Sequence, residues 1–309
     1  MSSFSGSFKV PKNGPTFIAA ILERCKKLIQ YGIWDGLSTS KLLGWFANFA
    51  TTEEKYFAAC VLDSLIYRSD AQTLALASHL FQRILPDLSR LDPPPVVPNW
   101  IEQMRKKSPS IDPRVRIIPV VRPDHPPTKS GYIVARLLKR HLGIDERWIV
   151  QPHSIEDHLR DGAAFFLFID DFLGTGDEFE GFANTLTLDQ HLRSVYAAYT
   201  PLVAYKQGLT DLRVRFPYLR VMAVETLDES HRLFHAESHC FEDGLNAAEM
   251  VKTFYYQLLD RKGIRIDPAY ACGYGNLELA YAFQHAIPDN SLPILWWTGT
   301  NGWNPLFVR

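Results

Sequence analysis

The chain has few cysteines and no excess of charge of either sign. Its four cysteines, Cys25, Cys60, Cys240 and Cys272, stand far apart and show no Cys-x-x-Cys or Cys/His ligand spacing. This disfavours a structural zinc site and a disulfide framework, and it favours a reduced, cytoplasmic setting. The 33 basic and 34 acidic side chains give a net charge of -1, so a nucleic acid would need a local basic patch to bind.

Long apolar runs and several common motifs are also missing. No stretch reaches the ~18 uninterrupted apolar residues of a transmembrane helix, and residues 1–6 lack the basic and apolar regions of a signal peptide. The sequence contains no Gly-x-Ser-x-Gly, Gly-x-Gly-x-x-Gly or Walker loop. With 309 residues, 46% of them hydrophobic, we expect a globular chain with a large core and no membrane span.

A proline run separates two patterns of apolar residues. Residues 15–91 place apolar side chains at helical spacing, which predicts three or four amphipathic helices. The segment 92–98 contains four prolines and cannot be helical, because proline lacks the amide donor. We therefore predict an N-terminal helical region over 1–95 and an α/β domain over 96–309.

Apolar runs typical of strands alternate with helical patterns after the proline run. The predicted strands span residues 115–121, 148–150, 165–169, 195–205, 221–226 and 294–297. The predicted helices span residues 130–141, 178–184, 208–216, 245–261 and 277–285. Such alternation predicts an α/β fold with a mostly parallel sheet and helices on both faces. The strand at 165–169 is apolar throughout, which is typical of a central strand whose carboxyl end opens onto a binding crevice.

Two adjacent acids and a turn of small residues follow this central strand. Because side chains alternate along a strand, one carboxylate of the pair Asp170 and Asp171 can face the crevice, where ribose hydroxyls are natural partners. The turn Gly174, Thr175 and Gly176 would present backbone amides to a phosphate if it opens the next helix. The pattern favours a ribose-phosphate cradle, and the alternative is a buried strand that ends in solvated acids.

The two residues after this turn are acidic, which is unusual beside a phosphate. Asp177 and Glu178 would repel a dianionic phosphate if they pointed toward it. Three interpretations remain open. The acids belong to the first turn of the next helix, they hold Mg²⁺ through water together with Asp170 and Asp171, or the ligand is a nucleotide that makes no 5-phosphate contact here.

The segment 165–176 resembles the signature of type I phosphoribosyltransferases, in which four apolar residues precede an acidic pair, two apolar residues and a Thr-Gly phosphate loop. In that family the pair contacts the ribose hydroxyls of phosphoribosyl pyrophosphate, and the loop binds its 5-phosphate. The resemblance also implies that Lys129, Ser130 and Gly131, which follow an earlier strand, bind pyrophosphate. The alternative is a helix start with Ser130 as its cap and Lys129 in solvent.

Three further segments, 45–49, 271–276 and 302–307, are similar to phosphoribosyltransferase-like effectors of bacterial conflict systems, encoded in antiphage loci such as some retrons. This resemblance spans nearly the whole chain. It implies an effector held quiet, until infection, by a partner such as a reverse transcriptase, a noncoding nucleic acid or another protein of the defence locus.

We expect an enzyme that acts at the anomeric carbon of phosphoribosyl pyrophosphate or a nucleotide. In this hypothesis Asp170 and Asp171 hold the ribose hydroxyls and Mg²⁺ as positive charge develops on the sugar. The alternative is a catalytically inactive module of the same fold that senses a nucleotide or binds a partner.

The remaining candidates are weaker. Asn290 could read a base edge and Trp296 could stack on a base, although a turn at 288–291 and core packing explain the same residues. A transition-metal site is conceivable at His231, His235 and His239, with Glu237 and Cys240 nearby. A basic stretch that could contact phosphate or RNA contains Lys206, Arg213, Arg215 and Arg220. Solvated helix surfaces are the alternative for both clusters.

Overall fold

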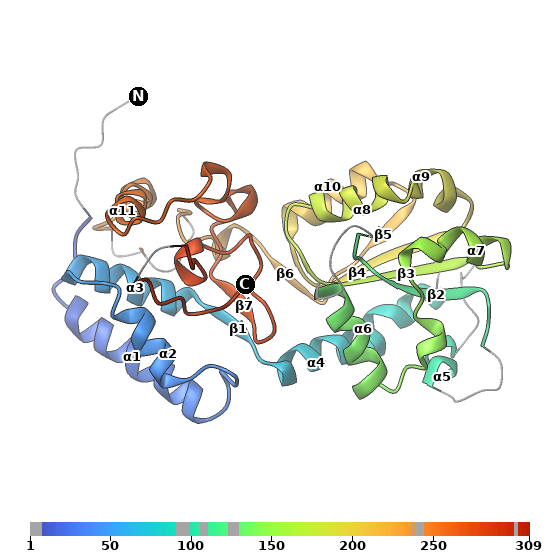
Figure 1. Cartoon of the computed structure of the whole chain (residues 1–309), viewed down its shortest axis with the longest axis horizontal. Helices are drawn as coiled ribbons and strands as arrows, with labels where there is room; N and C mark the ends of the chain where they lie inside the picture. The colour runs from blue at the N-terminus through green and yellow to red at the C-terminus, as the bar shows by residue number, and fades with distance from the viewer. Residues whose placement is uncertain are drawn as a thin grey trace. The chain divides into compact units, whose positions relative to one another are not determined.

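The computed structural model describes residues 8–90, 99–105, 111–122, 130–236, 238, 241, 244–299 and 302–309. The chain forms two compact units, which are coloured along the sequence in Figure 1. The first unit joins Met1–Asp70 to Asp228–Arg309, and the second unit is Ala71–Leu227. The boundaries of these units along the sequence differ from those of the predicted ranges 1–95 and 96–309.

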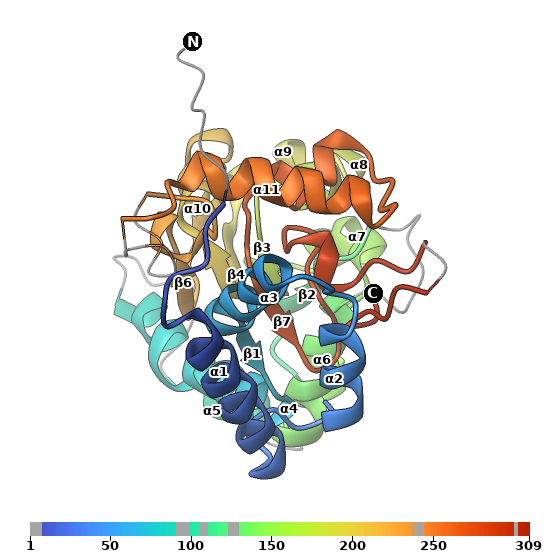
Figure 2. The ribbon, with the colours of Figure 1, turned by 90° about the vertical axis from the view of Figure 1, so that its left-hand side faces the viewer.

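The first unit brings the two ends of the sequence together. Its elements are α1 (Gly14–Gln30), α2 (Thr39–Phe46), α3 (Thr52–Ser64), β1 (Ile66–Arg68), α11 (Ala248–Arg261) and β7 (Tyr281–Phe283). The short strands β1 and β7 pair in parallel, with Ile66 opposite Tyr281, and Figure 2 shows them side by side. Helix α3 begins where its sequence signals indicate, because the Thr51 hydroxyl accepts the Glu54 N–H at 3.2 Å.

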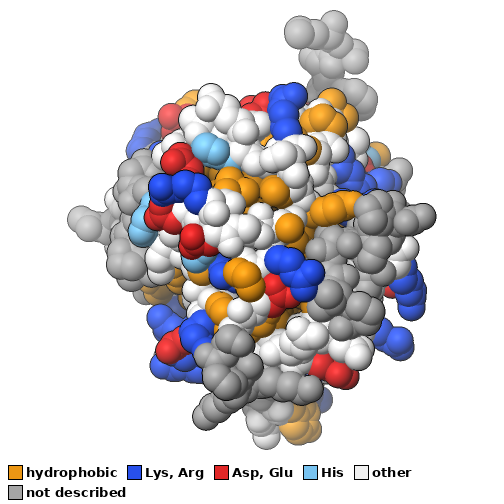
Figure 3. Space-filling view, turned by 90° about the vertical axis from the view of Figure 1, so that its right-hand side faces the viewer, with side chains coloured by type: hydrophobic (Ala, Val, Ile, Leu, Met, Phe, Trp, Pro, Cys, Tyr) orange, Lys and Arg blue, Asp and Glu red, His pale blue; other side chains and the backbone are white. Residues whose placement is uncertain are grey.

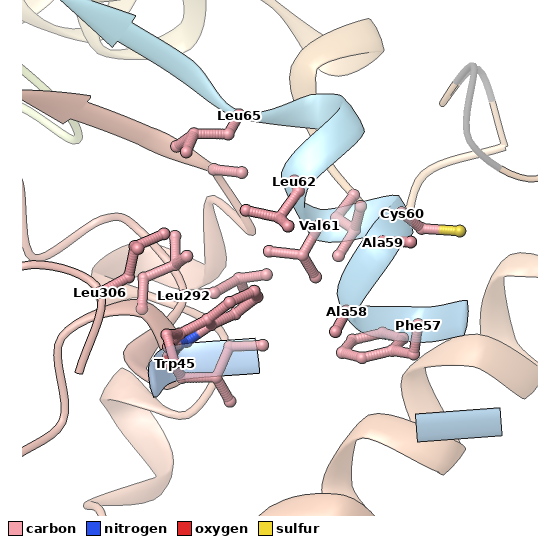
Figure 4. Packing of buried hydrophobic residues seen from close by; sticks show 14 of the residues in the cluster. Trp45, Phe57, Ala58, Ala59, Cys60, Val61, Leu62, Leu65, Leu292 and Leu306 are labelled. Carbon is pink, nitrogen blue, oxygen red and sulfur yellow. Dashed lines mark hydrogen bonds between the residues drawn. The ribbon is translucent and has the colours of Figure 1, made fainter. Parts of the chain in front are cut away.

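A buried tryptophan ties the C-terminal segment to the N-terminal helices. Trp45 of α2 is fully buried, and its indole N–H donates to the Ile294 carbonyl oxygen at 2.8 Å. Figure 4 shows Trp45 beside Leu292 and Leu306, with Val61 of α3 in the same cluster. Burial of an aromatic side chain whose N–H is also satisfied stabilises this association between distant parts of the sequence.

Two predicted elements of the C-terminal segment are wrong. The segment 277–285 contains β7 rather than a helix, and 294–297 overlaps a 3-10 turn (Pro293–Leu295) rather than a strand. Four residues just before β7 have the positive φ that a right-handed helix excludes: Gly273, Gly275, Asn276 and Glu278. Apolar spacing alone does not reveal such a backbone.

The second unit holds the predicted α/β pattern. Its helices are α4 (Asp70–His79, which begins in the first unit), α5 (Trp100–Arg105), α6 (Ser130–His141), α7 (Ile155–Arg160), α8 (Asp177–Thr185), α9 (Leu188–His191) and α10 (Lys206–Arg215). Its strands are β2 (Val115–Pro119), β3 (Phe165–Leu173), β4 (Tyr196–Tyr205), β5 (Leu219–Val221) and β6 (Glu225–Leu227).

The five strands form one parallel sheet, as predicted. Their order is β2-β3-β4-β5, and β6 also pairs with β4. In place of the single strand predicted at 221–226, the structure has two short strands, β5 and β6, which both pair with β4. The predicted strand at 148–150 is a single bridge between Ile149 and Ile117. Figure 1 shows α8, α9 and α10 on one face of the sheet and α6 on the other. The α/β fold class is confirmed.

Strand β3 is central and buried on both faces. Phe166 and Phe168 pack on the face that α8 covers, where Phe168 contacts Phe179 and Phe182 of that helix.

On the face of the molecule in Figure 3, Lys and Arg side chains are interspersed with Asp and Glu rather than gathered in one basic patch. No helix in the described ranges is long and apolar enough to cross a membrane.

Candidate functional site

The acidic pair lies within the central strand rather than after it. β3 was expected to end at Ile169, but its pairing with β4 continues, with Phe172 opposite Val203 and Leu173 opposite Ala204. Asp170 and Asp171 are each 4% exposed. Two carboxyl groups are therefore removed from solvent near the carboxyl end of the central strand, where open α/β sheets bind ligands.

Asp170 has hydrogen-bond donors on both oxygens. The Tyr199 hydroxyl donates to Oδ2 at 3.1 Å, and the Asp171 backbone N–H donates to Oδ1 at 2.9 Å. The Tyr199 ring is itself fixed by stacking on Phe179 of α8, with 4.4 Å between the ring centroids. The side chain of Asp170 thus lies on the α8 face, and the Asp171 side chain is close enough to hydrogen-bond with it.

Burial changes the protonation of Asp170 and of its partner Tyr199. Burial raises the pKa of Asp170 well above its ordinary value, and the charges of Asp171 and Glu178 raise it further. Burial, with the nearby Asp170, also raises the pKa of Tyr199 well above its usual range. The neutral acid is thus favoured at Asp170, and a neutral Tyr199 can continue to donate to it.

Replacing Asp170 with asparagine is expected to stabilise the second unit increasingly as the pH rises. A carboxyl whose pKa is higher in the folded than in the unfolded chain makes the protein lose stability as the pH climbs from 3.8, its ordinary pKa, toward the raised value. Asparagine resembles the neutral acid and avoids that loss. Urea unfolding between about pH 5 and pH 8 should show a widening difference between variant and wild type, and a difference that narrows would contradict the raised pKa.

The turn after β3 opens a helix, as predicted. Gly174, Thr175 and Gly176 connect β3 to α8, and Gly176 has φ of +95°, a conformation that glycine adopts without strain. A Cβ on Gly208 of α10 would overlap the carbonyl oxygen of Gly174. The close approach of α10 therefore fixes the turn so that the first amides of α8 border it.

Asp177 and Glu178 belong to the first turn of α8, which confirms the helix-start interpretation. The Asp177 carboxylate is also paired within the unit. Its Oδ2 accepts the Thr175 hydroxyl at 2.8 Å, and its Oδ1 lies 3.3 Å from Nη1 of Arg215. Arg215 also contacts Glu180, at 2.6 Å. The charge of Asp177 is thus compensated by residues of the second unit.

The predicted pyrophosphate loop lies partly outside the described residues. Lys129 and the side chain of Ser130 lie outside the described residues, so their binding role stays a prediction. Helix α6 begins at Ser130, as the sequence indicates. A Cβ on Gly131 would lie 2.9 Å from the Val120 carbonyl oxygen, so the start of α6 is pressed against the chain that leaves β2.

The two predicted base-binding residues lie in the first unit, whereas the acidic pair lies in the second. The Asn290 side-chain amide donates to the Tyr274 carbonyl oxygen at 2.9 Å, and the Trp296 indole N–H donates to the Ser291 carbonyl oxygen at 3.0 Å. The Arg309 guanidinium lies over the Trp296 ring, 4.9 Å from its centroid. These contacts hold the C-terminal segment, and the base-binding role of both residues stays a prediction.

The histidine and basic clusters are engaged in local structure. His231 Nδ1 lies 2.9 Å from Asp228 Oδ1, whereas His239, Glu237 and Cys240 fall outside the described residues. Within the described ranges, no group of three or more His, Cys, Asp or Glu residues could hold a metal ion. In the basic stretch, Arg213 donates to the Val221 carbonyl oxygen at 2.8 Å.

Sequence reasoning missed Tyr199 and the role of Arg215. Tyr199 stands in an apolar strand, and only the register of β3 against β4 brings it to Asp170. Arg215 looked like one residue of a solvated basic helix. Its contact with Asp177, 38 positions earlier, depends on how α10 packs beside α8.

The open parallel sheet, the buried acidic pair and the Gly-Thr-Gly turn at a helix start define an α/β protein of phosphoribosyltransferase type. The model of the PRTase-CE family matches residues 42–309, and the chain belongs to this family of phosphoribosyltransferase-like conflict-system effectors. The match begins within α2 and includes residues of both units. No curated protein matches the chain.

Proposed function

We propose that the second unit binds the ribose of phosphoribosyl pyrophosphate or of a nucleotide and acts at its anomeric carbon, as the effector of an antiphage system. The observation that carries the proposal is a buried acidic pair beside a glycine turn that opens α8. Family membership supports the general class of activity. A defence-locus partner, such as a reverse transcriptase or noncoding nucleic acid, would keep the effector quiet before infection.

Asp171 is the carboxylate proposed to meet the ligand, because the neutral form of Asp170, which burial favours by raising its pKa, cannot supply a full negative charge. It would accept ribose hydroxyls and stabilise the positive charge that develops on the sugar as the bond to the leaving group breaks. Asp170, kept largely neutral by burial, would hold the backbone of Asp171 in place.

Mg²⁺ fits this arrangement with Asp171 as a protein ligand, because Mg²⁺ sites commonly combine one or two carboxylates with ligand oxygens. Bound there, the ion would offset the negative charge of the leaving group. Asp170 is less suited to the ion, since its neutral form is favoured. Mg²⁺ therefore remains part of the proposal.

Replacing Asp170 and Asp171 together with asparagine is expected to abolish cellular toxicity or defence while the protein stays folded. Nucleotide pools measured in cells that express the active protein should lose one member, which names the substrate, and the double variant should restore it. Glu180→Gln, which changes an acid of α8 outside the pair, is the matched control and should retain activity. Full activity in the double variant would sink the catalytic proposal.

A nucleotide-sensing module without turnover is the second candidate. The hydroxyl of Thr175 and both oxygens of Asp170 form hydrogen bonds within the second unit. Such internal hydrogen bonds are compatible with a site that binds a nucleotide and does not convert it. Pools that stay unchanged, together with a nucleotide affinity that falls in Asp171→Asn, would favour this candidate over the enzyme.

A further inference from the structure

We infer that Asp177 occupies the phosphate loop as an internal anion, so that the ribosyl ligand of this chain is a nucleoside-type compound with an unphosphorylated 5-hydroxyl. This inference rests on the proposed ribose-binding function and, within it, replaces phosphoribosyl pyrophosphate and 5-nucleotides by ribosyl ligands that lack a 5-phosphate. It makes Asp177 a residue that determines specificity, with Arg215 as the residue that positions it.

The hydroxyl of the loop already has an anionic acceptor. A threonine hydroxyl carries a single proton to donate, and the Thr175 proton goes to Asp177 Oδ2 at 2.8 Å. The Asp177 backbone N–H in turn approaches the Thr175 oxygen at 3.4 Å. A ligand phosphate would have to displace this carboxylate before it could accept from Thr175.

Arg215 keeps the Asp177 carboxylate where it is. Its guanidinium Nη1 lies 3.3 Å from Asp177 Oδ1 and 2.6 Å from Glu180 Oε2, so one cation bridges two acids of α8. Arg215 is the last residue of α10, and the first turn of the same helix presses on the loop through Gly208. The position of Asp177 is therefore supported by the packing of a neighbouring helix as well as by its charge.

The carboxylate of Asp177 opposes a second anion at the start of α8. It lies against the loop hydroxyl, 2.8 Å from Thr175 Oγ1, where a phosphate oxygen would otherwise accept. A dianionic phosphate beside this carboxylate would meet repulsion between like charges, whereas a neutral 5-hydroxyl would not.

Titration of the purified full-length chain with nucleosides and their 5-monophosphates tests the inference, because each pair differs only in the phosphate. The wild type is expected to bind a nucleoside at least as tightly as its monophosphate. Asp177→Ser should raise the affinity for the monophosphate about tenfold and change that for the nucleoside by less than about twofold. Serine removes the charge and keeps a hydroxyl beside the loop.

Glu180→Gln is the matched control, because it removes a charge from the same helix turn and a partner of Arg215 but leaves the Thr175 contact intact. It should reproduce only a small part of the gain. A wild type that prefers the monophosphate about tenfold, with no gain in Asp177→Ser, overturns the inference and leaves the ribose-binding function standing. If neither ligand of any pair binds the wild type, the proposed function and the inference both fail.

Discussion

Gly208→Ala is expected to lower the free energy of unfolding by about 3 kcal/mol, although alanine normally stabilises a helix relative to glycine. A Cβ at this position would overlap the Gly174 carbonyl oxygen and lie 3.0 Å from the carbonyl carbon. Both obstacles are backbone atoms, which cannot move aside by changing a rotamer. Either α10 or the turn after β3 must shift.

The same substitution should also impair the candidate site. Gly174 begins the turn that leads into α8, so a displaced carbonyl moves the amides that border the proposed ligand. We expect faster hydrogen exchange at Thr175 and Gly176 and a weaker affinity for the ligand identified by titration. The loss of affinity should accompany the loss of stability, because one steric overlap causes both.

Gly181→Ala is the matched control, since this glycine also lies within a helix of the second unit. The nearest atom to its added Cβ is the end of the flexible Arg122 side chain, at 3.4 Å. Here the ordinary helix preference should prevail, with a gain of up to ~1 kcal/mol. Urea unfolding measures both variants. Equal effects of the two substitutions would show that Gly208 is not a site of backbone contact.

The parts of the fold that were predictable are those whose signals are local. The apolar run before Asp170 predicts a central strand, and the small residues before Asp177 predict the start of α8. Helix α6 has the predicted bounds. For the strand and for α8, a few consecutive residues determine the backbone through burial and through the conformation of glycine.

The parts that could not be predicted depend on distant contacts or on unusual backbone. The bond between Tyr199 and Asp170 needs the register of two strands, and the pairing of Arg215 with Asp177 needs the packing of two helices. Glu278 adopts φ of +56° although it is not a glycine, so the residue type does not predict this backbone conformation. Tertiary structure must support such a residue against its own preference.

Glu278 also carries a buried charge, which makes the first unit sensitive to loss of its partners. Its side chain is 1% exposed, and its Oε1 lies 2.7 Å from Lys252 Nζ and 3.3 Å from Arg232 Nη2. Within the described residues its Oε2 has no hydrogen-bond partner. The burial of this carboxylate is therefore compensated by two cations, which both form ion pairs with its Oε1 atom.

Lys252→Met is expected to lower the free energy of unfolding by about 3 kcal/mol, because a buried carboxylate loses the shorter of its two ion pairs. Lys27→Met is the control, since Lys27 and Glu23 are 4.0 Å apart and 57% and 59% exposed. That exposed pair should contribute less than about 0.5 kcal/mol. Urea unfolding that finds similar losses for both variants would contradict the role assigned to Glu278.

Combining Lys252→Met with Glu278→Gln separates loss of charge balance from loss of packing. If the cost of Lys252→Met arises from an uncompensated buried charge, the neutral glutamine should recover most of the lost stability. If it arises from lost contacts of the lysine stem, the second substitution should recover nothing. We expect recovery, because Lys252 is 25% exposed whereas the Glu278 side chain is almost fully buried, so the charge left behind lies on the group that solvent cannot reach.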